Sequence, residues 1–226
     1  VFPPNKLLNF INTIICIYQI VRFEFIDIYY CRYWDKSLEV YTLQKKLKKT
    51  TNHAKHNTVK FQSKCKRIKI VLTDVDGVLT NSSQYYSKNG EVLKRFHVRD
   101  GMGINILRRK NIPTIIVTKE KSVIVKKWAK KMNVRKVMDG IIKKETIVKQ
   151  LIKEFNFKKD EFAYIGDDVN DIQLLKIVGF SACPADGDFE VKNIVDYVCC
   201  QNGGQGAFRE IIDLIMSYQF PSEKRY

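Results

Sequence analysis

From residue 68 onward, short apolar runs alternate with longer segments of helical periodicity. The apolar runs have the length and composition of buried strands and lie at Ile68–Thr73, Pro113–Thr118, Phe162–Ile165 and Phe180–Cys183. The segments between and after them have the spacing of amphipathic helices and lie at Gly101–Lys110, Ser122–Met132, Lys144–Phe155 and Ala207–Ser217. Strands that alternate with helices form a parallel sheet covered on both faces. The sequence therefore predicts an α/β fold with a doubly wound parallel sheet.

A polar segment with a strong turn signal separates the first strand from the first helix. Tyr85-Tyr86 lies on one side of Asn89-Gly90, and the run Val92–Val98 lies on the other. Asn-Gly supplies the positive backbone angles that a tight hairpin turn requires. We therefore expect a small β-hairpin flap between the strand and the helix.

The N-terminal part of the chain differs from the rest in composition and charge. Ten Lys or Arg and no Asp or Glu lie between Lys45 and Lys69, and the whole chain carries a net charge of +16. The run has the composition of a solvated linker, with a tether for nucleic acid or lipid headgroups as the alternative. Because no nucleic-acid motif accompanies it, we expect no nucleic-acid partner. We divide the chain into an N-terminal extension over 1–65, one domain over 66–220 and a tail over 221–226.

Membrane association and disulfide formation are both disfavoured by the sequence. The segment Leu7–Val21 is uncharged over 15 residues, but it is interrupted by polar residues and is shorter than the roughly 20 apolar residues of a membrane span. The six cysteines are scattered, without a Cys-x-x-Cys pair, as expected for reduced thiols in a reducing compartment. We expect a cytoplasmic protein, with membrane association of the N-terminal segment as the alternative.

Acidic residues follow two of the predicted strands. Asp74 and Asp76 come directly after the first strand, and a run rich in acids extends from Gly166 to Asp171 after the strand Phe162–Ile165. Residues two apart in an extended chain point to the same side, so Asp74 and Asp76 are expected to present paired carboxylates. Because open α/β sheets bind ligands at the carboxyl ends of their strands, we expect one site at this edge.

The acidic residues are expected to hold a metal ion. Carboxylates gathered at one place repel one another unless a cation compensates their charge. Mg²⁺ prefers carboxylates, a carbonyl and waters, and here Asp74, the Asp76 carbonyl and Asp167 are the predicted ligands. Helix capping, the alternative, explains one of the acids well and the whole set poorly.

Two further residues complete a phosphate site. Thr118 ends the second predicted strand, and its hydroxyl can donate to a phosphoryl oxygen. Lys144, which we prefer over Lys143, opens a helix and can neutralise developing negative charge. Either residue alone is ordinary, because most Thr and Lys at such places are caps or solvated charges. Thr118 and Lys144 support a phosphate site because of the order in which they occur along the chain relative to the acidic residues.

The order Asp-x-Asp, Thr, Lys and Gly-Asp-Asp resembles the haloacid dehalogenase superfamily of phosphatases. The resemblance covers roughly residues 67–218. Four segments look more narrowly like its capless branch: Asp74-Val-Asp-Gly-Val-Leu-Thr80, Phe96-His-Val-Arg-Asp-Gly101, Gly166-Asp-Asp-Val-Asn-Asp171 and Gly203-Gly-Gln-Gly-Ala-Phe-Arg-Glu210. That branch includes 3-deoxy-D-manno-octulosonate 8-phosphate phosphatases and the phosphatase-like domains of acylneuraminate cytidylyltransferases. The resemblance implies a Rossmann-like fold of the haloacid dehalogenase type, without a large cap domain.

The resemblance also implies an activity and a role for each matched residue. The chain would be a Mg²⁺-dependent phosphomonoesterase acting on a sugar-acid phosphate. Asp74 would attack phosphorus and form an aspartyl phosphate, and Asp76 would act as general acid and then general base. Asp167 would be the acidic metal ligand, while the phosphoryl group would be held by Thr118 and Lys144.

The remaining implied roles concern the rim of the site and the assembly. Asp168 and Asp171 would shape the site, and Arg99 and Arg209 would meet the substrate carboxylate or phosphate. Members of the branch are homotetramers in which the hairpin packs on a neighbour, so the resemblance implies a homotetramer here.

The resemblance leaves the substrate open. Many relatives have Gly-Arg after the strand threonine, whereas this chain has Lys119-Glu120-Lys121-Ser122, which looks more like the form attached to cytidylyltransferases. Phosphates of 3-deoxy-octulosonate (at O8) and of N-acylneuraminate (at O9) are therefore both candidates. The alternative function is a non-catalytic tetramerisation or regulatory domain related to the C-terminal part of N-acylneuraminate cytidylyltransferase. The presence of Asp74, Asp76 and Asp167 favours the enzyme.

Overall fold

The computed structural model of this protein describes residues 62–222. Of the expected N-terminal extension (1–65), only residues 62–65 are described, and they are helical; of the expected tail (221–226), only residues 221–222 are described. The uncharged segment Leu7–Val21 lies outside the described residues. No helix within residues 62–222 has the length and apolar character needed to cross a membrane.

One sheet of six parallel strands organises the described part of the chain. Its strand order is β5-β4-β1-β6-β7-β8, and all of its pairings are parallel. The strands are β1 (Ile70–Thr73), β4 (Thr114–Val117), β5 (Lys136–Met138), β6 (Phe162–Ile165), β7 (Phe180–Cys183) and β8 (Tyr197–Val198). Because β1 pairs with β4 on one side and β6 on the other, its carboxyl end lies between the loops that follow those two strands.

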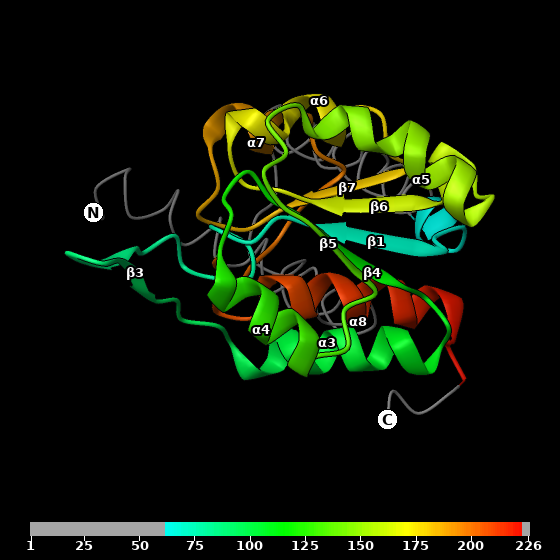
Figure 1. Cartoon of the computed structure of the whole chain (residues 1–226). Helices are drawn as coiled ribbons and strands as arrows, with labels where there is room; N and C mark the ends of the chain where they lie inside the picture. The colour runs from blue at the N-terminus through cyan, green and yellow to red at the C-terminus, as the bar shows by residue number, and fades with distance from the viewer. Residues whose placement is uncertain (1–61, 223–226) are drawn as a thin grey trace, which may run out of the picture. The chain divides into compact units, whose positions relative to one another are not determined.

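Helices cover both faces of the sheet, as the sequence predicts (Figure 1). One face carries α3 (Val98–Arg109), α4 (Val123–Lys131) and α8 (Ala207–Gln219), and the other carries α5 (Ile147–Phe155), α6 (Ile172–Leu175) and α7 (Phe189–Ile194). Three short 3-10 helices precede or follow these elements: η1 (Lys144–Thr146), η2 (Lys159–Glu161) and η3 (Val169–Asp171). The doubly wound α/β architecture is confirmed.

The four central strands β1, β4, β6 and β7 are mostly apolar because both of their faces are buried. In β1, Val71 belongs to the core layer that includes Ile104 of α3 and Phe208 of α8. Its neighbours Ile70 and Leu72 belong to the opposite layer. Successive strand residues point to opposite faces, so a strand buried on both sides shows an uninterrupted apolar run. Each fully buried aliphatic side chain contributes about 1.5–3 kcal/mol, which makes the sheet a firm base for the loops at its edge.

The predicted hairpin is present and extends away from the sheet (Figure 1). It consists of β2 (Tyr85–Ser87) and β3 (Gly90–Leu93). The second arm ends at Leu93 and does not reach Val98, and α3 already begins at Val98 instead of Gly101. Phe96 explains the difference, because it bridges to Thr80 and stacks on Trp128 with ring centroids 4.2 Å apart. Between β1 and β4 the chain forms only this hairpin and α3, as expected for a fold without a large cap domain.

Candidate active site

Asp74 follows the last residue of β1 and has both carboxylate oxygens engaged. Its Oδ1 accepts the Val75 N–H at 2.7 Å, and its Oδ2 accepts the ammonium of Lys144 at 2.6 Å. Only 5% of the residue is exposed. The loop backbone and a buried cation thus hold Asp74 in one orientation at the centre of the sheet edge.

Asp76 lies in a turn, because β1 already ends at Thr73. Its Oδ1 accepts hydrogen bonds from Thr80 Oγ1 at 3.1 Å and from Lys94 Nζ at 2.7 Å. The carboxylates that approach one another within 4.8 Å are those of Asp74, Asp167 and Asp171, without that of Asp76. Asp74 and Asp76 therefore do not follow the alternation of an extended strand that the sequence predicts. Instead, the carboxylate of Asp74 lies close to those of Asp167 and Asp171 in the loop after β6.

Gly77 makes room for the carboxylate of Asp167. Its φ is +89°, and a Cβ placed on it would lie 1.8 Å from Oδ2 of Asp167. A side chain at this position would be strained by the backbone angle and would clash with the carboxylate. Glycine after the second aspartate thus allows the loop after β6 to approach the loop after β1.

Asp171 is fully buried and connects the two acidic loops to Lys144. Its Oδ1 accepts Lys144 Nζ at 2.6 Å and also the hydroxyl of Tyr164. Its Oδ2 accepts the backbone N–H groups of Asp167 at 3.0 Å and Asp168 at 3.3 Å. Because all of these contacts converge on one side chain, Asp171 holds both Lys144 and the start of the β6 loop in place.

The electrostatics of the cluster favour a divalent cation. Burial and the charge of Asp171 raise the pKa of Asp74 to about 7. Burial, together with the charges of Asp74 and Asp171, raises the pKa of Asp167 to about 8. One buried oxygen of Asp167, Oδ1, has no hydrogen-bond partner among the described residues. Three ionised carboxylates against one ammonium leave two negative charges, so the residues fit a hard divalent ion.

Lys144 remains charged although it is buried, with 1% of the residue exposed. Burial by itself lowers the pKa of its ammonium, but the charges of Asp74 and Asp171 outweigh it and raise the pKa above its usual value. The exposed neighbour Lys143 makes no such contact with the carboxylates. Of the two lysines, the structure therefore brings Lys144 to the site.

The sequence did not indicate two residues of the site, Glu91 and Lys94. Glu91 belongs to β3, and Lys94 is the residue after that strand. Lys94 Nζ contacts Asp76 at 2.7 Å and Glu91 at 2.9 Å, and its side chain is 1% exposed. Glu91 also accepts the hydroxyl of Ser122, the N-cap of α4. Burial lowers the pKa of Lys94, but the two carboxylates raise it by more. The only signal in the sequence was a Glu-x-x-Lys spacing, and its meaning depends on how the hairpin returns to Asp76.

The other predicted site residues differ in their burial and in their hydrogen-bond partners. Thr118 is buried at the end of β4, and its Oγ1 accepts the N–H of Glu120 at 3.3 Å. Asp168 is exposed and caps η3. Arg99 is exposed on the first turn of α3, and the guanidinium of Arg209 pairs with Asp213 at 3.0 Å. Within the described residues, neither arginine forms a hydrogen bond or ion pair with the acidic cluster.

Comparison with known proteins identifies relatives of this chain. Residues 104–211 match the haloacid dehalogenase-like hydrolases. A 3-deoxy-D-manno-octulosonate 8-phosphate phosphatase of Haemophilus influenzae is 40% identical over 158 residues, which are 70% of this chain and 88% of the relative. The enzyme of the same description from Salmonella typhi is 34% identical over 157 residues, which are 70% of this chain and 84% of the relative.

Solved structures resemble the described fold over a similar share of the chain. The cobalt-bound form of the Haemophilus influenzae phosphatase has a TM-score of 0.67 and 40% identity, covering 69% of this chain and 91% of that one. The phosphatase of Moraxella catarrhalis, in complex with magnesium, phosphate and KDO, has a TM-score of 0.68 and 33% identity. The match with the Moraxella catarrhalis enzyme covers 70% of this chain and 91% of that one.

Proposed function

Because this chain belongs to the haloacid dehalogenase-like hydrolases and is a phosphatase, we propose that its substrate is 3-deoxy-D-manno-octulosonate 8-phosphate. The observation that carries this proposal is the 40% identity to a phosphatase of that specificity across 88% of its length. The Moraxella catarrhalis structure, which contains magnesium, phosphate and KDO, supports the same substrate and supports Mg²⁺ as the metal. The relatives favour the octulosonate phosphate over the acylneuraminate phosphate, and the enzyme over a non-catalytic domain.

In the proposed reaction, a carboxylate oxygen of Asp74 attacks the phosphorus atom of the substrate. The bond from phosphorus to the sugar oxygen breaks, and an aspartyl phosphate forms on Asp74. Hydrogen bonds from Val75 N–H and Lys144 Nζ hold the nucleophile in its orientation before the substrate arrives. Such fixed positioning lowers the entropic part of the barrier.

Asp76 has the proposed role of moving the protons. It protonates the sugar oxygen as that oxygen leaves, and then accepts a proton from the water that attacks the aspartyl phosphate. The products are inorganic phosphate, the free sugar acid and the original carboxylate of Asp74. Lys94 and Thr80 each hydrogen-bond Asp76 Oδ1, so they hold the carboxylate in one orientation while its other oxygen carries the proton.

The transferred phosphoryl group needs positive charge and hydrogen-bond donors. Lys144 brings a buried ammonium to the nucleophile at 2.6 Å. The Thr118 oxygen accepts the N–H of Glu120, which leaves the hydroxyl proton available for a phosphoryl oxygen. Mg²⁺, held by Asp74, Asp167 and the Asp76 carbonyl, would neutralise the charge between the anionic phosphate and the carboxylates. These roles keep five of the residues that the sequence assigned and add Lys94, but they use neither Arg99 nor Arg209. The five are Asp74, Asp76, Thr118, Lys144 and Asp167.

The substrate is tested by phosphate release with Mg²⁺ from three compounds. These are 3-deoxy-D-manno-octulosonate 8-phosphate, N-acetylneuraminate 9-phosphate and glucose 6-phosphate, which lacks the carboxylate. We expect kcat/KM for the octulosonate phosphate to exceed that for the neuraminate phosphate by about tenfold or more. Equal or better hydrolysis of the neuraminate phosphate would overturn the substrate, and no release from any compound by the folded protein would overturn the enzymatic function.

Lys94→Met should lower kcat more than it changes KM. Without the ammonium, Asp76 loses the contact that orients it, and general acid–base catalysis of this kind contributes about 10²–10⁴-fold. The loss should be smaller for p-nitrophenyl phosphate, whose leaving group needs little protonation. Steady-state kinetics with both substrates measure this difference. Lys88→Met, at an exposed lysine of the hairpin turn, is the matched control, and an equal loss on both substrates would contradict the positioning role.

Mg²⁺ affinity should rise with pH and level off at about pH 9. The metal binds the ionised carboxylates, so it displaces protons from groups with raised pKa values. With pKa values of about 7 and about 8, Asp74 and Asp167 are both mostly protonated at pH 6 and are both mostly ionised only near pH 9. The half-saturating Mg²⁺ concentration, measured from pH 6 to 9, should therefore fall as the pH rises. Asp160→Asn, which changes a carboxylate that pairs with Arg67 and whose side chain is 47% exposed, should leave this dependence unchanged, and a pH-independent affinity would contradict the cluster as the metal site.

We also propose that the chain forms a homotetramer through its hairpin. Four apolar residues of β2 and β3 are exposed to 44–63%: Tyr85, Tyr86, Val92 and Leu93. A projecting arm with this much apolar surface has the character of a contact surface rather than a solvated loop. The assembly stays a prediction.

A further inference from the structure

The hydroxyl of Tyr164 is a polar group that the packing of the core does not need. Tyr164 lies in β6, where it pairs with Leu72 of β1 on one side and with Ser181 of β7 on the other. The residue is fully buried, and its ring belongs to the apolar layer that includes Ile70 and Leu174. A phenylalanine would fill the same space without a hydroxyl, whose burial is unfavourable unless the group is hydrogen-bonded. The hydroxyl therefore calls for a role other than packing.

The Tyr164 hydroxyl begins a chain of hydrogen bonds that ends at the proposed nucleophile. It donates to Oδ1 of Asp171. The same oxygen accepts the ammonium of Lys144 at 2.6 Å, and that ammonium also contacts Oδ2 of Asp74 at 2.6 Å. Burial and the charges of Asp171 and Asp74 raise the pKa of Tyr164 well above its usual value, so the hydroxyl keeps its proton and remains a donor.

The other hydrogen bonds to the Asp171 carboxylate come from outside the sheet. Its Oδ2 accepts the backbone N–H groups of Asp167 and Asp168, which belong to its own loop. Lys144, which donates to Oδ1, belongs to η1. Within residues 62–222, the Tyr164 hydroxyl is therefore the only donor to this carboxylate that comes from a strand. It ties the position of the carboxylate to the buried sheet.

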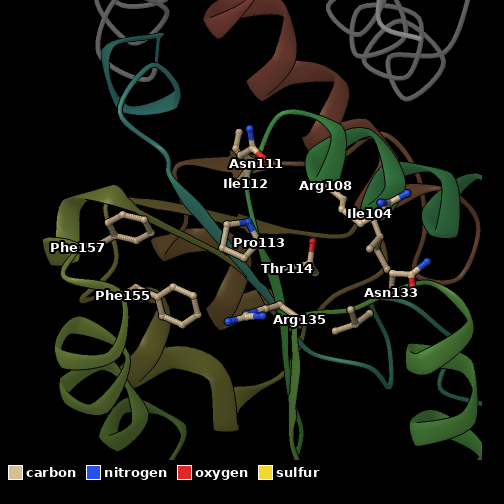
Figure 2. Close-up of a pocket in the computed structure, with 11 residues that line it drawn as sticks. Ile104, Arg108, Asn111, Ile112, Pro113, Thr114, Asn133, Arg135, Phe155 and Phe157 are labelled. Carbon is tan, nitrogen blue, oxygen red and sulfur yellow. The ribbon is translucent and has the colours of Figure 1, made fainter.

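Lys144 depends on this anchor because its helix is fixed at the other end. The 3-10 helix η1 continues directly into α5, which ends at Phe155. Phe155 stacks with Phe157, with ring centroids 5.9 Å apart, and both line a hollow at the edge of the sheet where β4 begins (Figure 2). The 9 residues of α5 place this stack about 14 Å from the start of the helix. Among the described residues, the ammonium itself is held only by Asp74 and Asp171.

The hydroxyl also affects how strongly Asp171 attracts the ammonium. When Asp74 attacks phosphorus, its carboxylate becomes an acyl phosphate and loses its negative charge. The Lys144 ammonium is then attracted by Asp171 on one side and by the phosphoryl oxygens on the other. Because the Tyr164 hydroxyl already donates to Asp171 Oδ1, it stabilises that carboxylate and weakens its pull on the ammonium. The ammonium thus stays at the phosphoryl group.

We propose that Tyr164 is a positioning residue for phosphoryl transfer. Its hydroxyl fixes Asp171 Oδ1 and thereby keeps the Lys144 ammonium at Asp74 and at the incoming phosphoryl group. Tyr164 acts through these residues and does not itself contact the substrate. The inference rests on the proposed role of Asp74 as the nucleophile, but it does not depend on which sugar acid carries the phosphate.

The test compares Tyr164→Phe with the natural chain on the octulosonate phosphate and on p-nitrophenyl phosphate, both with Mg²⁺. Misplacement of a group at the reacting centre costs up to about 10²-fold, so kcat/KM should fall by about 10–100-fold. The factor should be the same for both substrates, because Tyr164 acts on the nucleophile and not on the leaving oxygen. In this the variant differs from Lys94→Met. Tyr197→Phe is the matched control, since it removes a hydroxyl of β8 that donates to Glu210 at 2.8 Å, and it should leave kcat/KM unchanged.

Orthovanadate gives a readout that a purely structural change would not move. Vanadate adopts the trigonal bipyramid of a phosphoryl group in transfer, and such an analogue depends on the same contacts as the transition state. Its Ki should therefore rise in Tyr164→Phe by about the factor that kcat/KM falls, while the Ki of inorganic phosphate changes little. Both phenylalanine variants lose one hydrogen bond to a carboxylate, so each Tm should fall by about 2–8 °C. Kinetics are measured well below both Tm values.

Three results would overturn the inference. These are a kcat/KM of Tyr164→Phe within about twofold of the natural chain, an equal loss in Tyr197→Phe, or an unchanged Ki of vanadate. A folded natural chain that releases phosphate from neither compound would overturn the proposed function instead. In that case calorimetric titration with vanadate and Mg²⁺ decides on Tyr164, because binding requires no turnover, and equal affinity of the natural chain and Tyr164→Phe would exclude the positioning role.

Discussion

Asp74→Asn should abolish phosphate release, with kcat reduced by about 10⁴-fold or more, while the fold is retained. The amide has the shape of the carboxylate and can still accept the Val75 N–H, but it has no anionic oxygen to attack phosphorus. Lys144 keeps its contact with Asp171 in this variant. The mutual repulsion of the three carboxylates falls, while the amide NH2 group now faces the Lys144 ammonium, so the free energy of unfolding should change little.

Steady-state kinetics on the octulosonate phosphate, with thermal unfolding as the fold control, measure this effect. Asp160→Asn is the matched variant, because it makes the same chemical change at a half-exposed carboxylate that pairs with Arg67. Activity of Asp74→Asn within about tenfold of the natural chain would exclude Asp74 as the nucleophile.

Lys144→Met should both inactivate the protein and destabilise it by about 3–5 kcal/mol. The ammonium lies 2.6 Å from Asp74 and from Asp171. Removing it leaves two buried carboxylates facing each other without a cation, which is far more costly than losing a surface ion pair. Mg²⁺ should restore part of the stability, because it brings positive charge to the same carboxylates.

The destabilisation by Lys144→Met should depend on pH in a definite direction. A carboxylate whose folded pKa is raised favours folding in its protonated form, so stability falls as the pH rises from the unfolded value toward the folded one. The pKa of Asp74 is already about 7 in the natural chain, and loss of the ammonium raises it further. The variant should therefore be less destabilised at pH 6 than at pH 8.

Denaturant unfolding at both pH values measures these changes. Lys143→Met removes an exposed lysine next to Lys144 and should alter the free energy of unfolding by less than about 0.5 kcal/mol. Equal effects of the two substitutions would contradict the role assigned to Lys144.

The sequence predicted the central strands well, because their boundaries are set by local chemistry. The predicted bounds of two strands, Phe162–Ile165 and Phe180–Cys183, coincide with those of β6 and β7. Both are apolar runs that are followed directly by Gly or Pro. The short elements β5, β8 and α7 were not anticipated. Lys136–Met138 has only three residues, one of them charged, and forms a strand only because it pairs with β4.

The sequence predicted which residues form the candidate site better than it predicted how they are arranged. The acids Asp74 and Asp167 and the lysine Lys144 do meet at the sheet edge, as their positions after or beside strands implied. The orientation of Asp76 was not predictable, because it depends on where the chain leaves β1 and on the contact with Lys94. Tyr164 lies within the predicted strand Phe162–Ile165, and only the folded chain shows that its hydroxyl donates to Asp171.

Detection of a phosphoryl group on Asp74 tests the central claim most directly. The Asp76→Asn variant, incubated with Mg²⁺ and p-nitrophenyl phosphate, can form the aspartyl phosphate without protonating the leaving group, but it lacks the base that activates water. Acid quenching followed by peptide mass spectrometry should therefore find phosphate on the peptide that contains Asp74. A phosphoryl group on a different residue, or none on the folded variant while the natural chain releases phosphate, would contradict the account.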